Sequence, residues 1–198
     1  MRYSHLCRVF LVMLITLSIG PPARGASKPV VPKAGDRLPE IVLPLPAEEQ
    51  HRQELGLAAP PAETFTLSTV AADLVVVEIF SMYCPHCQRE APKVNRLHAA
   101  LLKRPVSAPK IRLLGIGVGN TPMEVAVFRK TYQIPFPLFS DGDFTIHKQL
   151  GEVRTPFFFA FRPGDPGPHR IRLAHMGPFE DVAAFVHRLD KLAEETSP

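Results

Sequence analysis

Apolar and polar positions alternate along the middle of the chain in blocks that predict strands separated by helices. Apolar, β-branched runs of about four to eight residues are typical of buried strands, and apolar residues at helical spacing are typical of helices that cover a sheet. The expected strands are residues 39–45, 64–70, 74–81, 111–118, 136–140, 156–161 and 170–176. The expected helices are residues 84–102, 121–132, 143–150 and 179–195. Residues 46–63 are expected to form a long loop, with room for one helical turn. Such alternation favours β-α-β units, and a closing hairpin adds antiparallel edges, so we expect an α/β fold with a central mixed β-sheet flanked by helices.

The first 25 residues have a different pattern from the rest of the chain. Arg2 and Arg8 precede or flank an 11-residue apolar run, Val9 to Ile19, and small residues stand at Ala23 and Gly25. A basic start, a short apolar run and a small-residue site are typical of a secretory signal peptide. An uncleaved membrane anchor is the alternative, although the run is short for a span of about 20 residues.

The remaining chain divides into a tether and one domain. Residues 26–38 are Pro-rich and polar and are expected to form an extended tether, and residues 39–195 are long enough for one domain with its own core. We therefore expect residues 1–25 to be a signal peptide and the mature protein to be periplasmic or otherwise extracytoplasmic.

Charge argues against a nucleic-acid partner. The whole chain has a formal net charge of +4, and residues 1–25 contain three arginines and no acidic residue, so the mature chain would keep a charge of +1. The basic balance is then mostly a targeting feature, and we expect neither nucleic-acid nor anionic-membrane binding. Membrane anchoring is expected only if the leader is retained.

Two of the three cysteines stand close together, in the stretch VVVEIFSMYCPHC. Cys7 would be lost with the leader, so the mature chain would keep only Cys84 and Cys87. A lone, closely spaced pair in an exported protein points to redox chemistry. This pair would act without any small-molecule cofactor, as a redox-active disulfide between Cys84 and Cys87.

The expected position of the pair explains how it would react. Cys84 follows a buried strand and begins a helix, where the N–H groups and the helix dipole favour a thiolate. Pro85 suits the first helical position, and His86 places a titratable group, potentially cationic, beside the sulfur. Cys87 lies one turn later and is able to close a small ring with Cys84. We expect Cys84 to be the nucleophile and Cys87 the resolving thiol, in a pair whose disulfide is oxidising.

Three other uses of the cysteines remain open from these residues. A structural zinc site would need further ligands, but the sequence has no second Cys pair and no H-x3-5-H motif. A copper-binding site would combine both sulfurs with a distant histidine such as His147 or His175. An inert structural disulfide would constrain little chain, because its two cysteines lie one turn apart.

Glu78 interrupts the apolar strand six residues before Cys84. A buried carboxyl group has a raised pKa and is able to exchange a proton with the resolving thiol, through water. The alternatives are that Glu78 pairs with a lysine or lies at an exposed strand edge. His98 and His187, in contrast, are expected on solvated helix surfaces.

The active-site segment resembles those of thioredoxin-fold proteins. EIFSMYCPHC contains the Cys-Pro-His-Cys tetrapeptide of DsbA-type periplasmic oxidases, and CPHCQREAP, with Glu90 and Pro92, is similar to the C-x-x-C-x-x-E-x-P pattern of TlpA/ResA-type exported thiol–disulfide proteins. The resemblance covers about residues 35–195. It implies a thioredoxin-like fold with an N-terminal strand extension and one inserted β-α unit.

The resemblance also implies a cis-proline that faces the dithiol. Thr155-Pro156 matches it by position, and a trans proline that opens a strand is the alternative. Tyr83 replaces a common tryptophan, and Arg154 stands where a glycine is frequent, which concerns substrate preference. Pro156 is thus expected at the catalytic site, and Tyr83, Pro85, His86 and Thr155 are expected to contact substrate.

The function that these residues predict is thiol–disulfide exchange. The expected partners are exported proteins with thiols or disulfides and a partner redox protein that regenerates the pair. The Pro-His dipeptide favours oxidation of substrates, and the flanking frame favours reduction, so the direction stays open. A peroxiredoxin-like peroxidase is an alternative, with Ser81 where such enzymes have a threonine, and a copper-binding metallochaperone is another.

Overall fold

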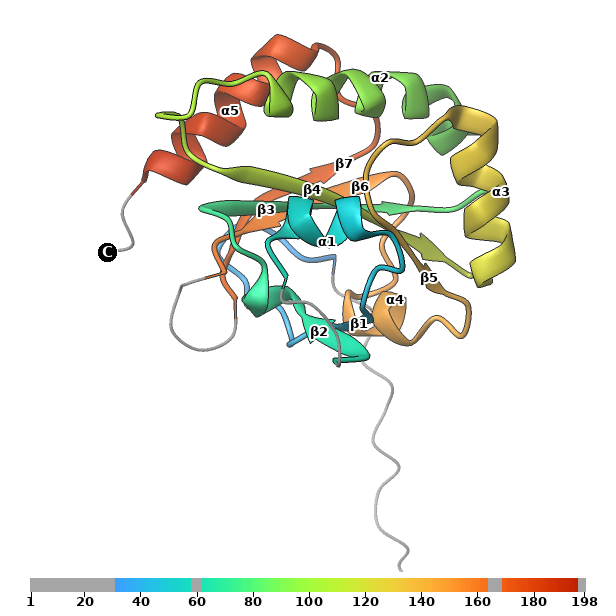
Figure 1. Cartoon of the computed structure of the whole chain (residues 1–198). Coiled ribbons are helices and arrows are strands. Elements are labelled where there is room, and N and C mark those ends of the chain that lie inside the picture. The colour runs from blue at the N-terminus through green and yellow to red at the C-terminus, as the bar shows by residue number, and fades with distance from the viewer. Residues whose placement is uncertain (1–30, 58–61, 164–168, 196–198) are drawn as a thin grey trace, which may run out of the picture.

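A five-stranded sheet forms the centre of the computed structural model, which describes residues 31–57, 62–163 and 169–195 (Figure 1). The expected signal peptide, residues 1–25, and the first part of the expected tether lie outside the described residues. Within the described ranges, no helix has both the length and the hydrophobicity needed to cross a membrane.

The helices and strands lie close to the expected positions. The strands are β1 (Val42–Pro44), β2 (Thr64–Thr66), β3 (Leu74–Phe80), β4 (Ile111–Val118), β5 (Leu138–Asp141), β6 (Phe157–Phe161) and β7 (Ile171–Met176). The helices are α1 (Glu49–Leu55), α2 (Pro85–Leu102), α3 (Pro122–Tyr132), α4 (Thr145–Gln149) and α5 (Val182–Glu194), with a short 3-10 helix at Leu67–Thr69.

Parallel and antiparallel pairs both occur in the central sheet, whose strand order is β5-β4-β3-β6-β7. The β3–β4 and β4–β5 pairs are parallel, and the β3–β6 and β6–β7 pairs are antiparallel. The predicted mixed sheet is therefore confirmed. β5 and α4 form the inserted β-α unit, and the antiparallel pair β1–β2 forms the N-terminal strand extension.

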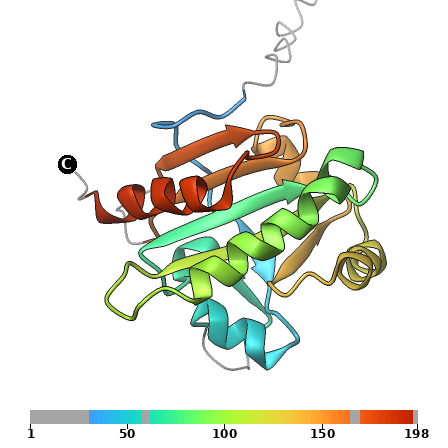
Figure 2. The same ribbon diagram turned by 90° about the horizontal axis from the view of Figure 1, so that it is seen from above.

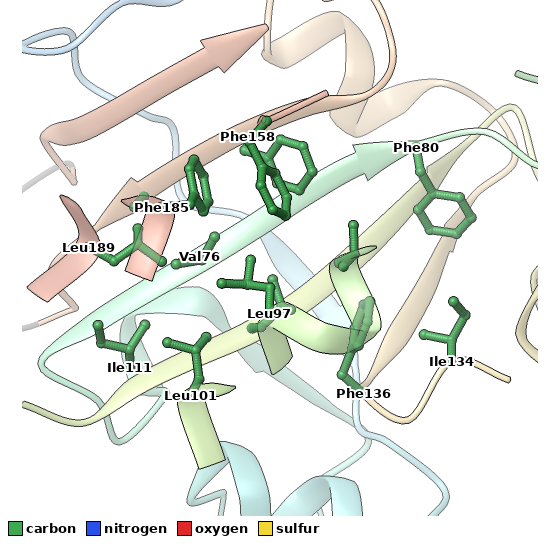
Figure 3. Close-up of a cluster of buried hydrophobic side chains, with 14 of the residues drawn as sticks. Val76, Phe80, Leu97, Leu101, Ile111, Ile134, Phe136, Phe158, Phe185 and Leu189 are labelled. Carbon is green, nitrogen blue, oxygen red and sulfur yellow. The ribbon is translucent and has the colours of Figure 1, made fainter. Parts of the chain in front are cut away.

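Helices α2 and α5 lie side by side over one face of the sheet (Figures 1 and 2). Leu74, Val76 and Phe80 of β3 belong to the core on this side. Figure 3 shows how the core is assembled, with Leu97 from α2 and Leu189 from α5 pointing toward the strands. The alternation of β3 places Glu78 on this same face.

The opposite face is covered by α1, α4 and the β1–β2 pair. Val75, Val77 and Ile79 of β3 pack there with side chains from each of these elements. The covering side chains are Leu43 of β1, Leu55 of α1, Phe65 of β2 and Ile146 of α4.

Helix α1 corrects the prediction of a loop at residues 46–63. Its seven residues end at Leu55 and are followed by Gly56, whose φ of 64° is a left-handed conformation that glycine adopts without a steric penalty. The helix buries Leu55 and His51, which are four residues apart. A histidine in the buried stripe gives little hydrophobic periodicity, so the sequence pattern does not reveal this helix.

Residues 35–38, at the end of the expected tether, pair with the chain at the start of β7. The Gly35 amide donates to the Ile171 carbonyl over 2.8 Å, and the Leu38 amide donates to the His169 carbonyl over 2.7 Å. Leu38 is also buried. Backbone hydrogen bonds to residues 169 and 171 and one buried apolar side chain thus hold this extended segment in place.

His98 was expected on a solvated surface but is buried. Its Nε2 lies 2.6 Å from Glu54 Oε1, and its ring lies against that of Phe136. The contact partner Glu54 belongs to α1, which the sequence pattern did not reveal, so the burial of His98 could not be foreseen. His187 is exposed, as predicted.

Candidate active site

Cys84 is the N-cap residue of α2, directly after the turn that follows β3, and Pro85 occupies the first turn of the helix. The Cys84 amide donates to the Ser81 carbonyl over 3.0 Å, which closes this turn. The Gln88 side chain donates to the Met82 carbonyl over 2.7 Å. Backbone and side-chain bonds thus hold the cysteine at the start of the helix, as the sequence predicted.

The Cys84 thiol is partly exposed and acidic. Burial opposes ionisation, but hydrogen bonds from the Thr155 side chain, the Cys87 backbone and thiol, and the His86 backbone outweigh it and lower the pKa of Cys84. Backbone amides at a helix N-terminus supply this kind of stabilisation to a thiolate. Cys84 therefore has the exposure and the electrostatics of an attacking sulfur.

Cys87 differs from Cys84 in both respects. It is fully buried and lies in the core on the α2 side. Burial, the hydrogen bond to Cys84 and repulsion by Glu78 raise the pKa of Cys87, against the weaker effect of hydrogen bonds from Ser81 and Thr155. Both cysteines are free thiols in this structure. The pair is asymmetric, with a reactive outer thiol and a protected inner one.

The peptide bond between Thr155 and Pro156 is cis, so the expected cis form is confirmed. The protonated Cys84 thiol donates to the Thr155 carbonyl, with a sulfur–oxygen distance of 3.3 Å. Pro156 is buried, and its carbonyl accepts from the Gly177 amide over 2.8 Å. The loop before β6 therefore meets the start of α2 at the sulfur, across 71 residues of sequence.

Glu78 is buried in the central strand β3, on the face that α2 covers. Burial, and secondly the charge of Glu90, raise the pKa of Glu78 to about 8. Neither a lysine nor an arginine among the described residues forms an ion pair with it. Glu78 is thus a buried, unneutralised carboxyl group that interacts electrostatically with Cys87, and not an exposed or lysine-paired residue.

His86 and Tyr83 lie at the exposed rim of the site. The Arg89 guanidinium lies 3.1 Å from His86 Nδ1, and since arginine only donates, this nitrogen carries no proton in that contact. The Tyr83 hydroxyl donates to Glu124 at the start of α3. Both ring positions are therefore set by neighbours that lie outside the Cys-Pro-His-Cys motif.

Two supporting residues were missed by sequence reasoning. Asn120 is fully buried after β4, and its side-chain oxygen accepts from the Met82 amide over 2.9 Å. No sequence signal links positions 38 residues apart. Arg89, in contrast, is three residues from His86 in a predicted helix, and that spacing could have indicated the contact.

Metal-ligating side chains do not gather near the sulfurs. In the part of the chain that the structure describes, no group of three or more histidine, cysteine, aspartate or glutamate residues is placed to hold a metal ion. The two histidines considered for copper lie against carbonyls, His147 at 2.8 Å from the Val153 oxygen and His175 at 3.3 Å from the Pro178 oxygen.

A family model described as AhpC/TSA family matches residues 34–172. None of the curated proteins compared with the chain matches it significantly. Among solved structures, a Chlorobium tepidum protein described as thiol:disulfide interchange protein DsbE is similar, with a TM-score of 0.60 and 14% identity over 83% of this chain and 99% of that chain.

Two further solved structures have the same architecture. One is a secreted Mycobacterium tuberculosis disulfide oxidoreductase described as homologous to E. coli DsbE, with a TM-score of 0.50 and 18% identity over 69% of this chain and 96% of that chain. The other is the thioredoxin domain of a Bacteroides vulgatus thiol-disulfide oxidoreductase, with a TM-score of 0.57 and 12% identity over 79% of this chain and 97% of that chain. At these identities the likeness shows the fold, which is thioredoxin-like, as predicted.

Proposed function

The chain belongs to the AhpC/TSA family, and from that premise we propose that it is a thiol–disulfide oxidoreductase whose redox pair is Cys84 and Cys87. The observation that carries the proposal is the asymmetry of the two thiols. Cys84 is partly exposed with a lowered pKa, and Cys87 is buried with a raised pKa. An outer thiolate that attacks and an inner thiol that resolves are the two parts that disulfide exchange requires.

Disulfide donation begins with the oxidised pair. A substrate thiolate attacks Cys84 Sγ, the substrate–Cys84 bond forms, and the Cys84–Cys87 bond breaks, so that Cys87 leaves as a thiolate and takes up a proton. A second substrate thiolate then attacks the substrate sulfur of the mixed disulfide, and Cys84 leaves as a thiolate. The substrate loses two electrons and the pair gains them. Reduction of a substrate disulfide is the same sequence in reverse.

Glu78 supplies the proton in the donation direction. With a pKa of about 8 it is protonated at neutral pH, and Cys87, whose raised pKa makes it a slow leaving group, needs a proton as the disulfide opens. In the reducing direction the carboxylate accepts that proton. Direct transfer and transfer through one water are both compatible with this role.

The substrate segment lies along the loop that ends in Thr155 and Pro156. Because proline has no N–H, the backbone of Thr155 is left to pair with an extended peptide beside the sulfur. Tyr83, Pro85 and His86 are exposed around Cys84 and would contact the same segment. The substrates are proteins with thiols or disulfides, and a partner redox protein restores the pair after each turnover.

The compartment is extracytoplasmic in this proposal. The support is the signal-peptide pattern of residues 1–25 and the description of one structural neighbour as secreted. A redox pair that exchanges disulfides with exported proteins fits such a compartment.

Alkylation of the reduced protein tests the asymmetry. Iodoacetamide should modify Cys84 with a pH midpoint below the ordinary value of about 8.5, while Cys87 should remain unmodified in the folded protein. Mass spectrometry of Cys84→Ser and Cys87→Ser variants assigns each thiol. If Cys84 does not react near neutral pH, or if both thiols react alike, the proposal fails.

Equilibration in glutathione buffers then determines the direction. A reduction potential near about −120 mV indicates a disulfide donor, and one near about −270 mV indicates a reductant. Rapid consumption of hydrogen peroxide by the reduced protein would contradict the proposal and favour a peroxidase.

A further inference from the structure

A pocket of about 480 Å³ is lined in part by Tyr83, which precedes Cys84 in the chain, and by Thr155, whose carbonyl accepts from the Cys84 thiol. It is lined by the ends of β3 and β4, by the inserted helix α4 and by the loop before Pro156. Since Thr155 both lines the pocket and contacts the Cys84 sulfur, a peptide whose cysteine reacts with Cys84 lies next to this pocket. The pocket is therefore placed to bind a side chain of the substrate near its reacting cysteine.

One wall of the pocket is apolar. Phe144 is 44% exposed, although large apolar side chains are usually covered. A side chain at Gly119 would come within 2.5 Å of the Phe144 ring, so the ring lies directly against the backbone there. Val118 and Val153 also line the pocket. An apolar side chain of a substrate would cover this wall and gain from leaving water.

The lining of the pocket also includes a cationic side chain, Arg154. Arg154 is exposed, and it has no hydrogen bond or ion pair with a described residue. The acidic groups near the site are engaged elsewhere, Glu124 with Tyr83 and Asp143 with Thr145. Glu152 is exposed but does not line the pocket. A carboxylate of the substrate would thus find an unpaired, permanent positive charge.

We propose that this pocket selects substrate segments that have an apolar and an acidic side chain close to the reactive cysteine, with Arg154 as the residue that determines the charge preference. The proposal rests on the function proposed above, because it needs Cys84 to form mixed disulfides. What it adds to that function is the kind of substrate side chain that the pocket prefers.

Competition between peptides tests the charge preference. In a Cys87→Ser chain, the Cys84 thiolate first attacks 2,2′-dithiodipyridine. The S–S bond of the reagent breaks, one thiopyridone leaves, and the Cys84–pyridyl disulfide forms. Two single-cysteine peptides, identical except for an Asp or a Lys two residues from the cysteine, then compete for it. The peptide thiolate attacks Cys84 Sγ, the bond to the pyridyl sulfur breaks, and thiopyridone leaves. Mass spectrometry gives the ratio of the two peptide adducts on Cys84.

The ratio should favour the acidic peptide and should fall by about three- to fivefold in Arg154→Glu. Arg188→Glu is the matched control, since Arg188 is an exposed arginine on α5 and should leave the ratio unchanged. Comparison of variants removes any intrinsic difference between the peptide thiols. A ratio that persists in Arg154→Glu, or falls equally in Arg188→Glu, overturns the inference.

Phe144→Ala tests the apolar wall in the same way. The preference for a peptide with Phe over one with Ala beside the cysteine should fall by at least about threefold, whereas Val106→Ala, at a fully exposed valine after α2, should not change it. An unchanged preference in Phe144→Ala overturns the apolar part. If no peptide forms an adduct, the proposed function itself fails, and if adducts form without preference, only the inference fails.

Discussion

The two faces of the central sheet are built from the same strands but bury different groups. The face under α2 and α5 contains two buried carboxyl groups, Glu78 and Glu90, among its apolar side chains. The other face receives Val75, Val77 and Ile79 from β3, and these pack against apolar side chains of β1, β2, α1 and α4. Its buried carboxyl group, Asp141 of β5, accepts hydrogen bonds from the Ile146 and His147 amides of α4. One face is therefore mostly apolar, and the other also buries Glu78, a carboxyl group with a raised pKa that acts electrostatically on Cys87.

The two carboxyl groups of the α2 face are themselves different. Glu90 lies 3.3 Å from the Lys93 ammonium and accepts from the Phe179 amide over 3.2 Å, so its charge is compensated. Glu78 has no such cation among the described residues, and its pKa rises to about 8. A buried charge without a partner is costly, so the neutral form is favoured. The fold thus favours the protonated form of Glu78, whose charge would act on the Cys87 thiol.

The largest expected effect on stability comes from replacing either of two adjacent phenylalanines on β6, each in a separate variant. Phe158 and Phe159 are both fully buried but point to opposite faces. Phe158 is the cross-strand partner of Glu78, and Phe159 is that of Val77. Either change to Ala should lower the free energy of unfolding by about 3–5 kcal/mol, measured by urea unfolding with circular dichroism.

Only Phe158→Ala should also change the proton chemistry. It removes apolar cover from Glu78, so the pKa of Glu78 should fall, and the pH dependence of stability above pH 5 should weaken. Phe159→Ala is the matched control and should leave that pH dependence unchanged. If both variants alter the pH dependence of stability equally, Glu78 is not shielded by the α2 face in particular, and the comparison of the two faces fails.

Sequence patterns predicted most of the fold because the buried, apolar positions recur at the spacing of a strand or of a helix. The apolar run of β3 and the Thr121-Pro122 start of α3 were placed correctly. Helix α1 was missed because a histidine, His51, occupies its buried stripe. The burial of His98 was missed with it, since its partner Glu54 lies on that helix.

The site was predictable where neighbours in sequence are also neighbours in space. The start of one helix fixes the positions of Cys84, Pro85 and Cys87. The cis form of Pro156 was predicted from a family resemblance and not from the residues alone. The hydrogen bond from the Met82 amide to Asn120 depends on long-range packing, for which a single sequence has no signal.

Glu78→Gln tests the unneutralised carboxyl group directly. In the folded protein Glu78 has a pKa of about 8, and in the unfolded chain about 4.3. Between these values the folded state holds a proton that the unfolded state has lost, so stability falls as pH rises, by at most about 1.4 kcal/mol per pH unit. The variant should lose this slope between pH 5 and 8 and should be the more stable protein at pH 8.

Asp143→Asn is the control for this measurement. Hydrogen bonds from Thr145 lower the pKa of Asp143, so its contribution is present above the ordinary pKa of an aspartate, about 3.9, and is lost only as pH falls further. It should therefore not change the slope between pH 5 and 8. A wild-type slope that survives in Glu78→Gln would show that another group carries it.

Glu90→Gln should have the smallest effect, because the charge of Glu90 is the second cause of the shift at Glu78, after burial. The fall in stability with pH ends near the pKa of Glu78 in the folded protein. Removing the Glu90 charge should move this end point to lower pH, but by less than Phe158→Ala does, as measured by urea unfolding across pH 5 to 9. Lys93→Met makes the opposite change, since it leaves the Glu90 charge uncompensated, and it should not move the end point to lower pH. If Glu90→Gln had the larger effect, repulsion between the two carboxyl groups, and not the apolar cover of β6 and α2, would be what keeps Glu78 protonated.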